Sequence, residues 1–334
     1  MKHNVTIIIA AALAASLLLS CSKDSDCRDC FPESENQEEE STTKGTLTLS
    51  LDFPEEQGTK ALTAYTAAQP YETAINKVQV LVFNASGKLN AYRNLGTTAK
   101  ASITMTTGQK KVWAVINAPD LSGVTTESAL NNRIIALSSN STTPTIGFAM
   151  VGSTSCNLTA GGATANIAVS RLTSRVALQS VKNSLSSAYT SLTVKKIYLI
   201  NVVGNQNLAG TLGAAPSLNQ KLDKGEVPSL LSKTVNKAVA RTASYTPTTP
   251  DLFYGYANAT ATKTRLVVET DIAGQTYYYP ITLPSLERNK TYTISLDIQN
   301  LGSDDPDKPV EKGAVSVNVS VAGWVAGPTY EETI

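Results

Sequence analysis

Short runs in which apolar and polar residues strictly alternate recur along this chain. In the first run, over residues 46–53, threonine, serine and aspartate fall on one side, and the other side holds Leu47, Leu49, Leu51 and Phe53. Successive side chains of a strand point in opposite directions, so an alternation of period two is typical of a strand that buries one face. We therefore expect residues 46–53 to form a half-buried first strand.

Further strand-like segments follow, and most of them are bounded by Gly, Pro or Asn. They lie at residues 78–82, 111–116, 165–169, 175–181, 194–203, 264–271, 277–283, 292–299 and 315–321. Residues 84–88 read as a hairpin turn after the second strand. Residues 122–137 have helix-compatible spacing and should form the one helix of the first half, with one or two short helices in the whole chain. Many short strands with few helices predict a mainly β fold of antiparallel β-sandwiches rather than a sheet of alternating strands and helices.

The length of the chain predicts two such domains. A chain of 334 residues is long enough for about two domains of ordinary size. We place the boundary near Ser170, which gives an N-terminal domain over residues 46–170 and a C-terminal domain over residues 171–334.

The N-terminus has the pattern of a lipoprotein signal peptide. Cationic residues at the start precede an apolar run over residues 5–19, which ends at Ser20 and Cys21. The alternative is a transmembrane anchor, but this run is shorter than the roughly twenty residues that span a bilayer. We expect residues 1–20 to be removed and Cys21 to carry the lipid.

Two polar segments flank the first strand. Residues 21–45 are polar and acidic, and they predict a disordered tether. Residues 54–64 form a polar loop that contains Lys60 and is a natural target for a protease. Cys27 and Cys30 lie in the tether, where a disulfide or idle thiols are expected rather than half of a zinc site.

The sequence offers little that could support catalysis. The only histidine, His3, lies in the predicted signal peptide, so the mature chain has no histidine base or histidine metal ligand. We find no phosphate-binding or dinucleotide-binding glycine motif, and we expect no cofactor. A net charge of +1 does not favour nucleic acid as a partner. A carboxylate glycosidase and a calcium site at residues 304–307 remain as minor alternatives.

Several segments, taken in order, resemble the fimbrillin family of fimbrial subunits from Porphyromonas and Bacteroides. The resemblance runs from about Gly45 to the end of the chain. Its best pieces are residues 80–87, 112–118, 148–152, 169–176, 253–258, 278–281 and 288–292. Within these pieces, we expect Phe83, Trp113 and Tyr254 to be core aromatics, and Arg171 and Arg175 to lie at the surface or at a domain interface.

The resemblance implies a fold and a mechanism of assembly. Members are similar in having two transthyretin-like β-sandwich domains, in being exported to the outer membrane as lipoproteins, and in losing the first strand to a trypsin-like protease. Here the cut would fall between Lys60 and Ala61, where the best-studied members have arginine in place of lysine. A strand donated by a neighbour would then fill the opened groove.

The donor strand in the family generally comes from the C-terminal tail, here residues 325–334. Its apolar residues are Val325, Tyr330 and Ile334. Partners would be copies of the same chain and other fimbrial subunits, and the protein would not be an enzyme. The alternative is a surface lipoprotein that is never cut and serves as a fimbrial anchor, accessory subunit or tip adhesin.

Overall fold

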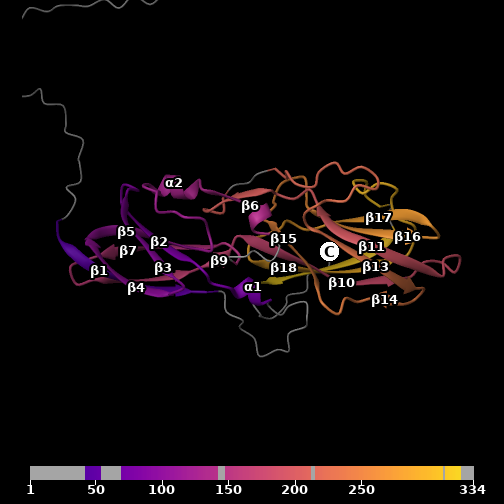
Figure 1. Cartoon of the computed structure of the whole chain (residues 1–334), viewed down its shortest axis with the longest axis horizontal. Helices are drawn as coiled ribbons and strands as arrows, with labels where there is room; N and C mark the ends of the chain where they lie inside the picture. Colours follow the sequence, from indigo (N-terminus) through magenta and orange to yellow (C-terminus); the bar gives the residue numbers. More distant parts are fainter. Residues whose placement is uncertain (1–41, 54–68, 142–146, 212–214, 311–312, 325–334) are drawn as a thin grey trace, which may run out of the picture. The chain divides into compact units, whose positions relative to one another are not determined.

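The computed structural model describes residues 42–53, 69–141, 147–211, 215–310 and 313–324. Strands dominate this part of the chain, which confirms the predicted mainly β fold (Figure 1). Cys21, Lys60, Ala61 and the tail residues 325–334 lie outside the described residues.

Two sheets are built from strands that precede Leu172. One has the order β4-β1-β8 and the other the order β3-β2-β5-β7-β9. Their strands are β1 (Lys44–Asp52), β2 (Val78–Asn84), β3 (Leu89–Gly96), β4 (Lys100–Thr106), β5 (Gly108–Ile116), β7 (Met150–Leu158), β8 (Ala163–Ala168) and β9 (Ser170–Arg171). A buried apolar cluster joins the two sheets, with leucines of β1 against valines of β2 and β5. This pair of sheets is the scaffold that holds the first strand.

Two further sheets are built from strands that follow Leu172. One has the order β14-β10-β18-β19, with β15 also paired to β10, and the other has the order β13-β11-β16-β17. Their strands are β10 (Thr173–Asn183), β11 (Ser191–Ile200), β13 (Ser232–Ala240), β14 (Ser244–Tyr245), β15 (Asp251–Tyr256), β16 (Arg265–Ile272), β17 (Gln275–Thr282), β18 (Lys290–Ile298) and β19 (Val315–Gly323). Most neighbours are antiparallel, but β1 pairs with β8 and β10 pairs with β18 in parallel.

One short pairing and one apolar core cross the predicted boundary at Ser170. The strand β6 (Ile134–Ala136) pairs with β12 (Asn205–Asn207). A continuous buried cluster includes Leu81 and Trp113 as well as Leu199 and Val319. The described residues from Thr42 onward belong to one compact unit. The division into two domains near Ser170 therefore stays a proposal.

The helix expected over residues 122–137 is much shorter in the structure. The helix α2 spans Glu127–Asn131, and the side chain of Thr126 caps its start by accepting a hydrogen bond from the Ala129 amide at 3.2 Å. The chain then leaves the helix to form β6 and a 3-10 turn over Leu137–Ser139. The prediction was wrong in extent because the pairing with β12 satisfies the backbone of 134–136.

The other α-helix, α1 (Pro70–Thr73), is a single turn. No helix in the described ranges combines the length and the apolar character needed to cross a membrane.

Candidate functional site

The first strand lies in the middle of its sheet. β1 pairs antiparallel with β4, from Lys44 opposite Thr106 to Ser50 opposite Lys100. On its other side β1 pairs in parallel with β8, from Leu47 opposite Ala163 to Asp52 opposite Ala168. Removing β1 would therefore leave two strand edges facing each other across one empty position.

The side chains predicted to point inward from β1 do so. Leu47 and Leu49 are fully buried, Leu51 is 5% exposed, and Phe53 is half-buried beside the same apolar cluster. Full burial of one leucine side chain stabilises by about 2 kcal/mol. The opposite side of the strand faces water, where the hydroxyls of Thr46 and Thr104 lie 3.3 Å apart. β1 thus contributes three buried leucines to this apolar cluster.

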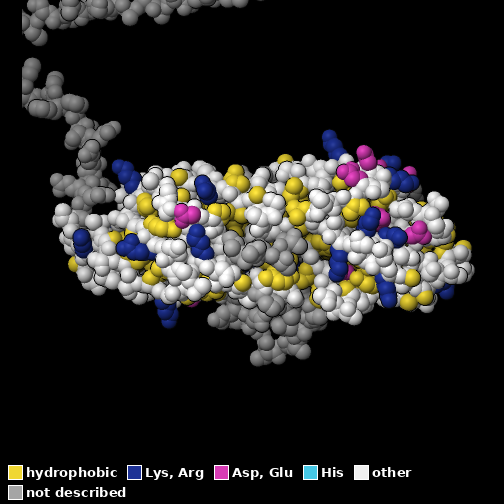
Figure 2. Space-filling model, viewed as in Figure 1, with side chains coloured by type: hydrophobic (Ala, Val, Ile, Leu, Met, Phe, Trp, Pro, Cys, Tyr) yellow, Lys and Arg dark blue, Asp and Glu magenta, His cyan; other side chains and the backbone are white. Residues whose placement is uncertain are grey.

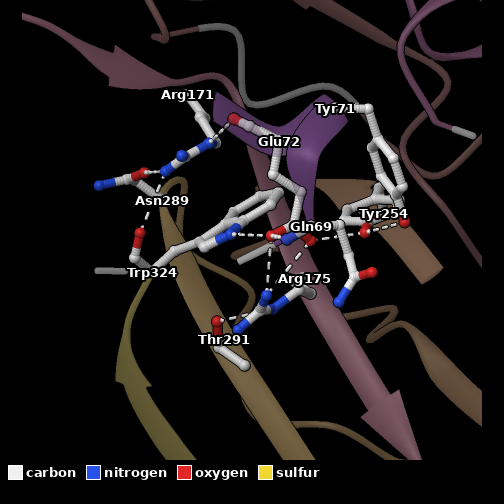
Figure 3. Close-up of polar contacts among 9 residues, drawn as sticks. All are labelled: Gln69, Tyr71, Glu72, Arg171, Arg175, Tyr254, Asn289, Thr291 and Trp324. Atoms are coloured by element: carbon white, nitrogen blue, oxygen red, sulfur yellow. Dashed lines mark hydrogen bonds and ion pairs between the residues drawn. The ribbon is translucent and has the colours of Figure 1, made fainter. Parts of the chain in front are cut away.

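A second group of residues surrounds the carboxylate of Glu72, which is fully buried (Figure 3). Glu72 lies in α1, the first described helix after the masked residues 54–68. Its Oε2 accepts hydrogen bonds from Arg175 Nη1 at 2.9 Å and from the indole Nε1 of Trp324 at 3.2 Å. Its Oε1 accepts one from the hydroxyl of Tyr254 at 2.6 Å. The carboxylate is therefore surrounded by donors from three distant parts of the chain.

The two arginines were expected at the surface or at a domain interface, and the surface part of that expectation is wrong. Arg171 is 2% and Arg175 1% exposed. Arg171 donates through Nε to the carbonyl of Glu72 at 2.9 Å and through Nη1 to the carbonyl of Trp324 at 3.0 Å. Arg175 Nε donates to the hydroxyl of Thr291 at 3.1 Å. A buried arginine requires such partners because an unpaired buried charge is costly.

Aromatic rings pack around the ionic cluster formed by Glu72, Arg171 and Arg175. The rings of Tyr254 and Trp324 stack with their centroids 5.4 Å apart, and Phe148 lies 4.5 Å from Tyr254. The guanidinium of Arg171 lies over the Trp324 ring at 4.7 Å, which adds a cation–π contact. Burial, followed by the charge of Glu72, raises the pKa of the Tyr254 hydroxyl far above its usual range. The phenol therefore stays protonated and donates to the carboxylate.

The hydrogen bonds of this cluster link separate parts of the chain. Glu72 already accepts hydrogen bonds from Arg175, Tyr254, Trp324 and the Gln69 amide, so its oxygens are occupied by protein donors. The cluster connects α1 to Trp324, which is the last described residue before the tail.

The remaining residues singled out in the sequence are core aromatics and the acidic residues of one loop. Phe83, Trp113 and Tyr254 are buried, as expected of core aromatics. In the described ranges, no three carboxylate, cysteine or histidine side chains come together as a metal site would require, and the Asp304 and Asp305 carboxylates face Lys308 at 3.7 and 3.9 Å. On the face shown in Figure 2, the described Lys and Arg side chains are interspersed with uncharged ones and with Asp and Glu.

Sequence reasoning missed Glu72 and Trp324 as partners. Glu72 and Trp324 are 252 positions apart, and neither stands in a motif of its own. The only available signal was the pair Arg171 and Arg175, because two arginines in a strand-rich segment call for acidic partners.

Comparison with known proteins places these features in context. The family model described as "Major fimbrial subunit protein (FimA)" matches residues 45–211. That range contains β1, α1 and both arginines of the cluster. The search of curated proteins finds no match.

Three solved structures share the fold. A proposed cell adhesion protein from Bacteroides eggerthii superposes with a TM-score of 0.65 at 19% identity, over 85% of this chain and 97% of that one. A second, from Parabacteroides distasonis, has a TM-score of 0.64 at 15% identity, over 85% and 97%. A fimbrilin from Porphyromonas gingivalis has a TM-score of 0.59 at 14% identity, over 84% and 98%. At these identities the likeness concerns the fold.

Proposed function

Because this chain belongs to the major fimbrial subunit protein (FimA) family, we propose that it is a structural fimbrial subunit that is exported as a lipoprotein, trimmed by a protease and polymerised by donor-strand exchange. In this proposal Cys21 carries the lipid that holds the precursor at the outer membrane. A trypsin-like protease then cuts between Lys60 and Ala61. The fibre serves adhesion at the cell surface, and the protein acts through assembly rather than catalysis.

The position of β1 is the observation that carries this proposal. A strand between two others is held by main-chain hydrogen bonds on both sides, and its three leucines fill the apolar cluster below it. Loss of such a strand exposes two unpaired edges and an apolar floor, so a new strand in the same place recovers both kinds of interaction. An edge strand would leave no comparable slot.

The proposed cut site and the proposed donor tail both lie close in sequence to residues of the ionic cluster. Glu72 follows the proposed cut site by 12 residues, and Trp324 directly precedes the tail with Val325, Tyr330 and Ile334. The cluster holds both segments in the described fold, so the core can keep its shape while the first strand leaves and the tail reaches a neighbour. Partners in the fibre would be further copies or other fimbrial subunits.

The alternative of an uncut anchor, accessory subunit or tip adhesin is compatible with the same pairing of β1. With β1 in place, its sheet is complete, and the strand pairs along most of its length with both neighbours. A subunit that kept β1 would be stable without a partner in this slot.

Replacing the proposed cleavage residue distinguishes the two functions. Lys60→Gln should leave the protein displayed but monomeric, because the uncut β1 still fills its slot. The matched control is Lys100→Gln, which changes an exposed lysine at the start of β4. The measurement is the ladder of polymers in unheated denaturing gels of the surface fraction. Ladders that persist in Lys60→Gln as in the control contradict cleavage at this residue as the trigger.

A further inference from the structure

The slot that holds β1 leaves no room for a side chain at Gly45. A Cβ atom built on Gly45 would lie 2.0 Å from the carbonyl oxygen of Thr159 and 3.1 Å from Cδ1 of Leu158. The first distance is far inside van der Waals contact, and the obstructing atom belongs to the backbone, so no side-chain rotation relieves the clash. Only glycine fits at this position of the strand.

The obstructing segment is a tight turn between β7 and β8. The Gly162 amide donates to the Thr159 carbonyl at 2.9 Å, and the Thr159 hydroxyl donates to the Gly162 carbonyl at 3.2 Å. Gly162 has a φ of +94°, which favours glycine, and a Cβ there would lie 3.0 Å from the carbonyl oxygen of Thr46. The backbones of the turn and the strand are therefore in direct contact, and two internal hydrogen bonds hold the turn in shape.

Beyond Gly45, the slot takes large aliphatic side chains at every second position. Leu47, Leu49 and Leu51 are each buried against the apolar cluster. A shift of the occupant by one residue turns its apolar side chains toward water. A shift by two residues places either Leu47 or Thr43 where only glycine fits. The slot thus specifies both the face and the register of its occupant.

We propose that the slot vacated by β1 receives an extended segment of a different fimbrial subunit, in which a glycine is followed at alternate positions by three large aliphatic residues. The glycine seats against the turn over residues 159–162 and sets the register. This inference rests on the proposed removal of β1, and it narrows the partner of that slot to another subunit.

The tail of this chain does not carry that order. Its glycine after Trp324 is Gly327, and the alternate positions that follow are Thr329, Glu331 and Thr333. These would direct two hydroxyls and a carboxylate into an apolar slot, and burying an unpaired carboxylate is costly.

The reversed direction does not restore the order. If Gly327 takes the place of Gly45, the alternate positions that precede it are Val325, Gly323 and Val321. Gly323 offers no side chain where the slot holds Leu49, and Gly323 and Val321 are already paired with β18.

Peptide capture by the cut protein tests the inference without any variant that has to fold. The full-length mature chain is nicked with trypsin in the loop after β1, and labelled peptides are added. The peptides are the β1 sequence over residues 44–52, the same peptide with Gly45→Val, the same peptide with Thr48→Val, and the tail sequence over residues 325–334. Thr48 is exposed on the outer side of β1, so its replacement is the matched control. Capture is followed by size-exclusion chromatography and by release of the native β1 fragment.

The expected result is capture of the β1 and Thr48→Val peptides. Affinity for the Gly45→Val peptide should be lower by at least about tenfold, with no detectable capture of the tail peptide. Capture of the Gly45→Val peptide or the tail peptide within about twofold of the β1 peptide overturns the inference and leaves donor-strand exchange standing. Capture of no peptide, with the β1 fragment retained, overturns the exchange itself and the inference with it.

Discussion

At the scale of single residues, the buried charge of Glu72 determines how the ionic cluster is held together. The Arg175 guanidinium lies 2.9 Å from this carboxylate, and both side chains are almost completely buried. A buried pair contributes little net stability compared with apolar residues, but removing one partner leaves the other charge uncompensated. The cluster is therefore sensitive to single substitutions on either side of the pair.

Glu72→Gln should destabilise the fold by about 3–5 kcal/mol, because Arg175 would keep its charge in a buried site without a counter-ion. The change preserves the shape of the side chain, so the loss reports charge rather than packing. Glu287→Gln is the control, since Glu287 is exposed. Urea unfolding of both variants and the wild type measures the difference. A stability for Glu72→Gln equal to that of the control contradicts the assigned role of the ion pair.

At the scale of elements, β1 belongs to the precursor in the proposed mechanism and is absent from the fibre. Leu49 is fully buried and central in the strand. Its contacts should therefore matter before cleavage and have no effect afterwards. An ordinary core residue affects stability in both states.

Leu49→Ala should lower the stability of the uncut precursor by about 2–5 kcal/mol, the usual cost of such a truncation in a core. Assembled fibres of the variant should dissociate at the wild-type temperature, because β1 has left them. Thr48→Ala, on the exposed side of the same strand, is the control. The measurement is thermal unfolding of the precursor and thermal dissociation of isolated fibres. Fibres that are weakened as much as the precursor contradict the loss of β1.

Alternation predicted some of the strands but missed β4 and β7, in which buried and exposed residues also alternate. Elements defined by distant partners were not predictable. The alternating leucines of β1 gave the correct strand and the correct buried face, and the valines of β2 gave the correct strand, although both faces of β2 are buried. By contrast, β3 was missed because it has no regular alternation of buried and exposed residues. β6 was taken for helix because its partner β12 lies about 70 positions later. The cluster around Glu72 follows the same rule, since its partners converge only in the folded chain.

At the scale of the whole molecule, buried tyrosines link stability to alkaline pH. Burial raises the pKa of Tyr198, Tyr254, Tyr256, Tyr278 and Tyr279, and raises that of Tyr292 to about 12. These phenols stay protonated in the fold at a pH where they ionise in the unfolded chain. Because the unfolded state then binds fewer protons, stability should fall as pH rises above about 10.

As the pH rises above 10, the preferential ionisation of each of these tyrosines in the unfolded chain should lower the free energy of unfolding by up to about 1.4 kcal/mol per pH unit. Tyr198→Phe provides a matched variant, because the Tyr198 hydroxyl is buried without a hydrogen-bond partner among the described residues. It should be as stable as wild type at pH 7 and should lose stability less steeply above pH 10. Urea unfolding across pH 7–11 measures both. Equal slopes for the variant and the wild type would rule out this contribution from Tyr198.

The N-terminus of the protein in isolated fimbriae shows whether β1 is lost on assembly. Intact-mass and N-terminal peptide mass spectrometry of the surface fraction would identify the first residue of the assembled chain. Donor-strand exchange predicts a chain that begins at Ala61 and lacks residues 44–60, with the slot of β1 filled by another segment. Assembled chains that begin at a lipid-bearing Cys21 and retain Leu47, Leu49 and Leu51 would contradict it.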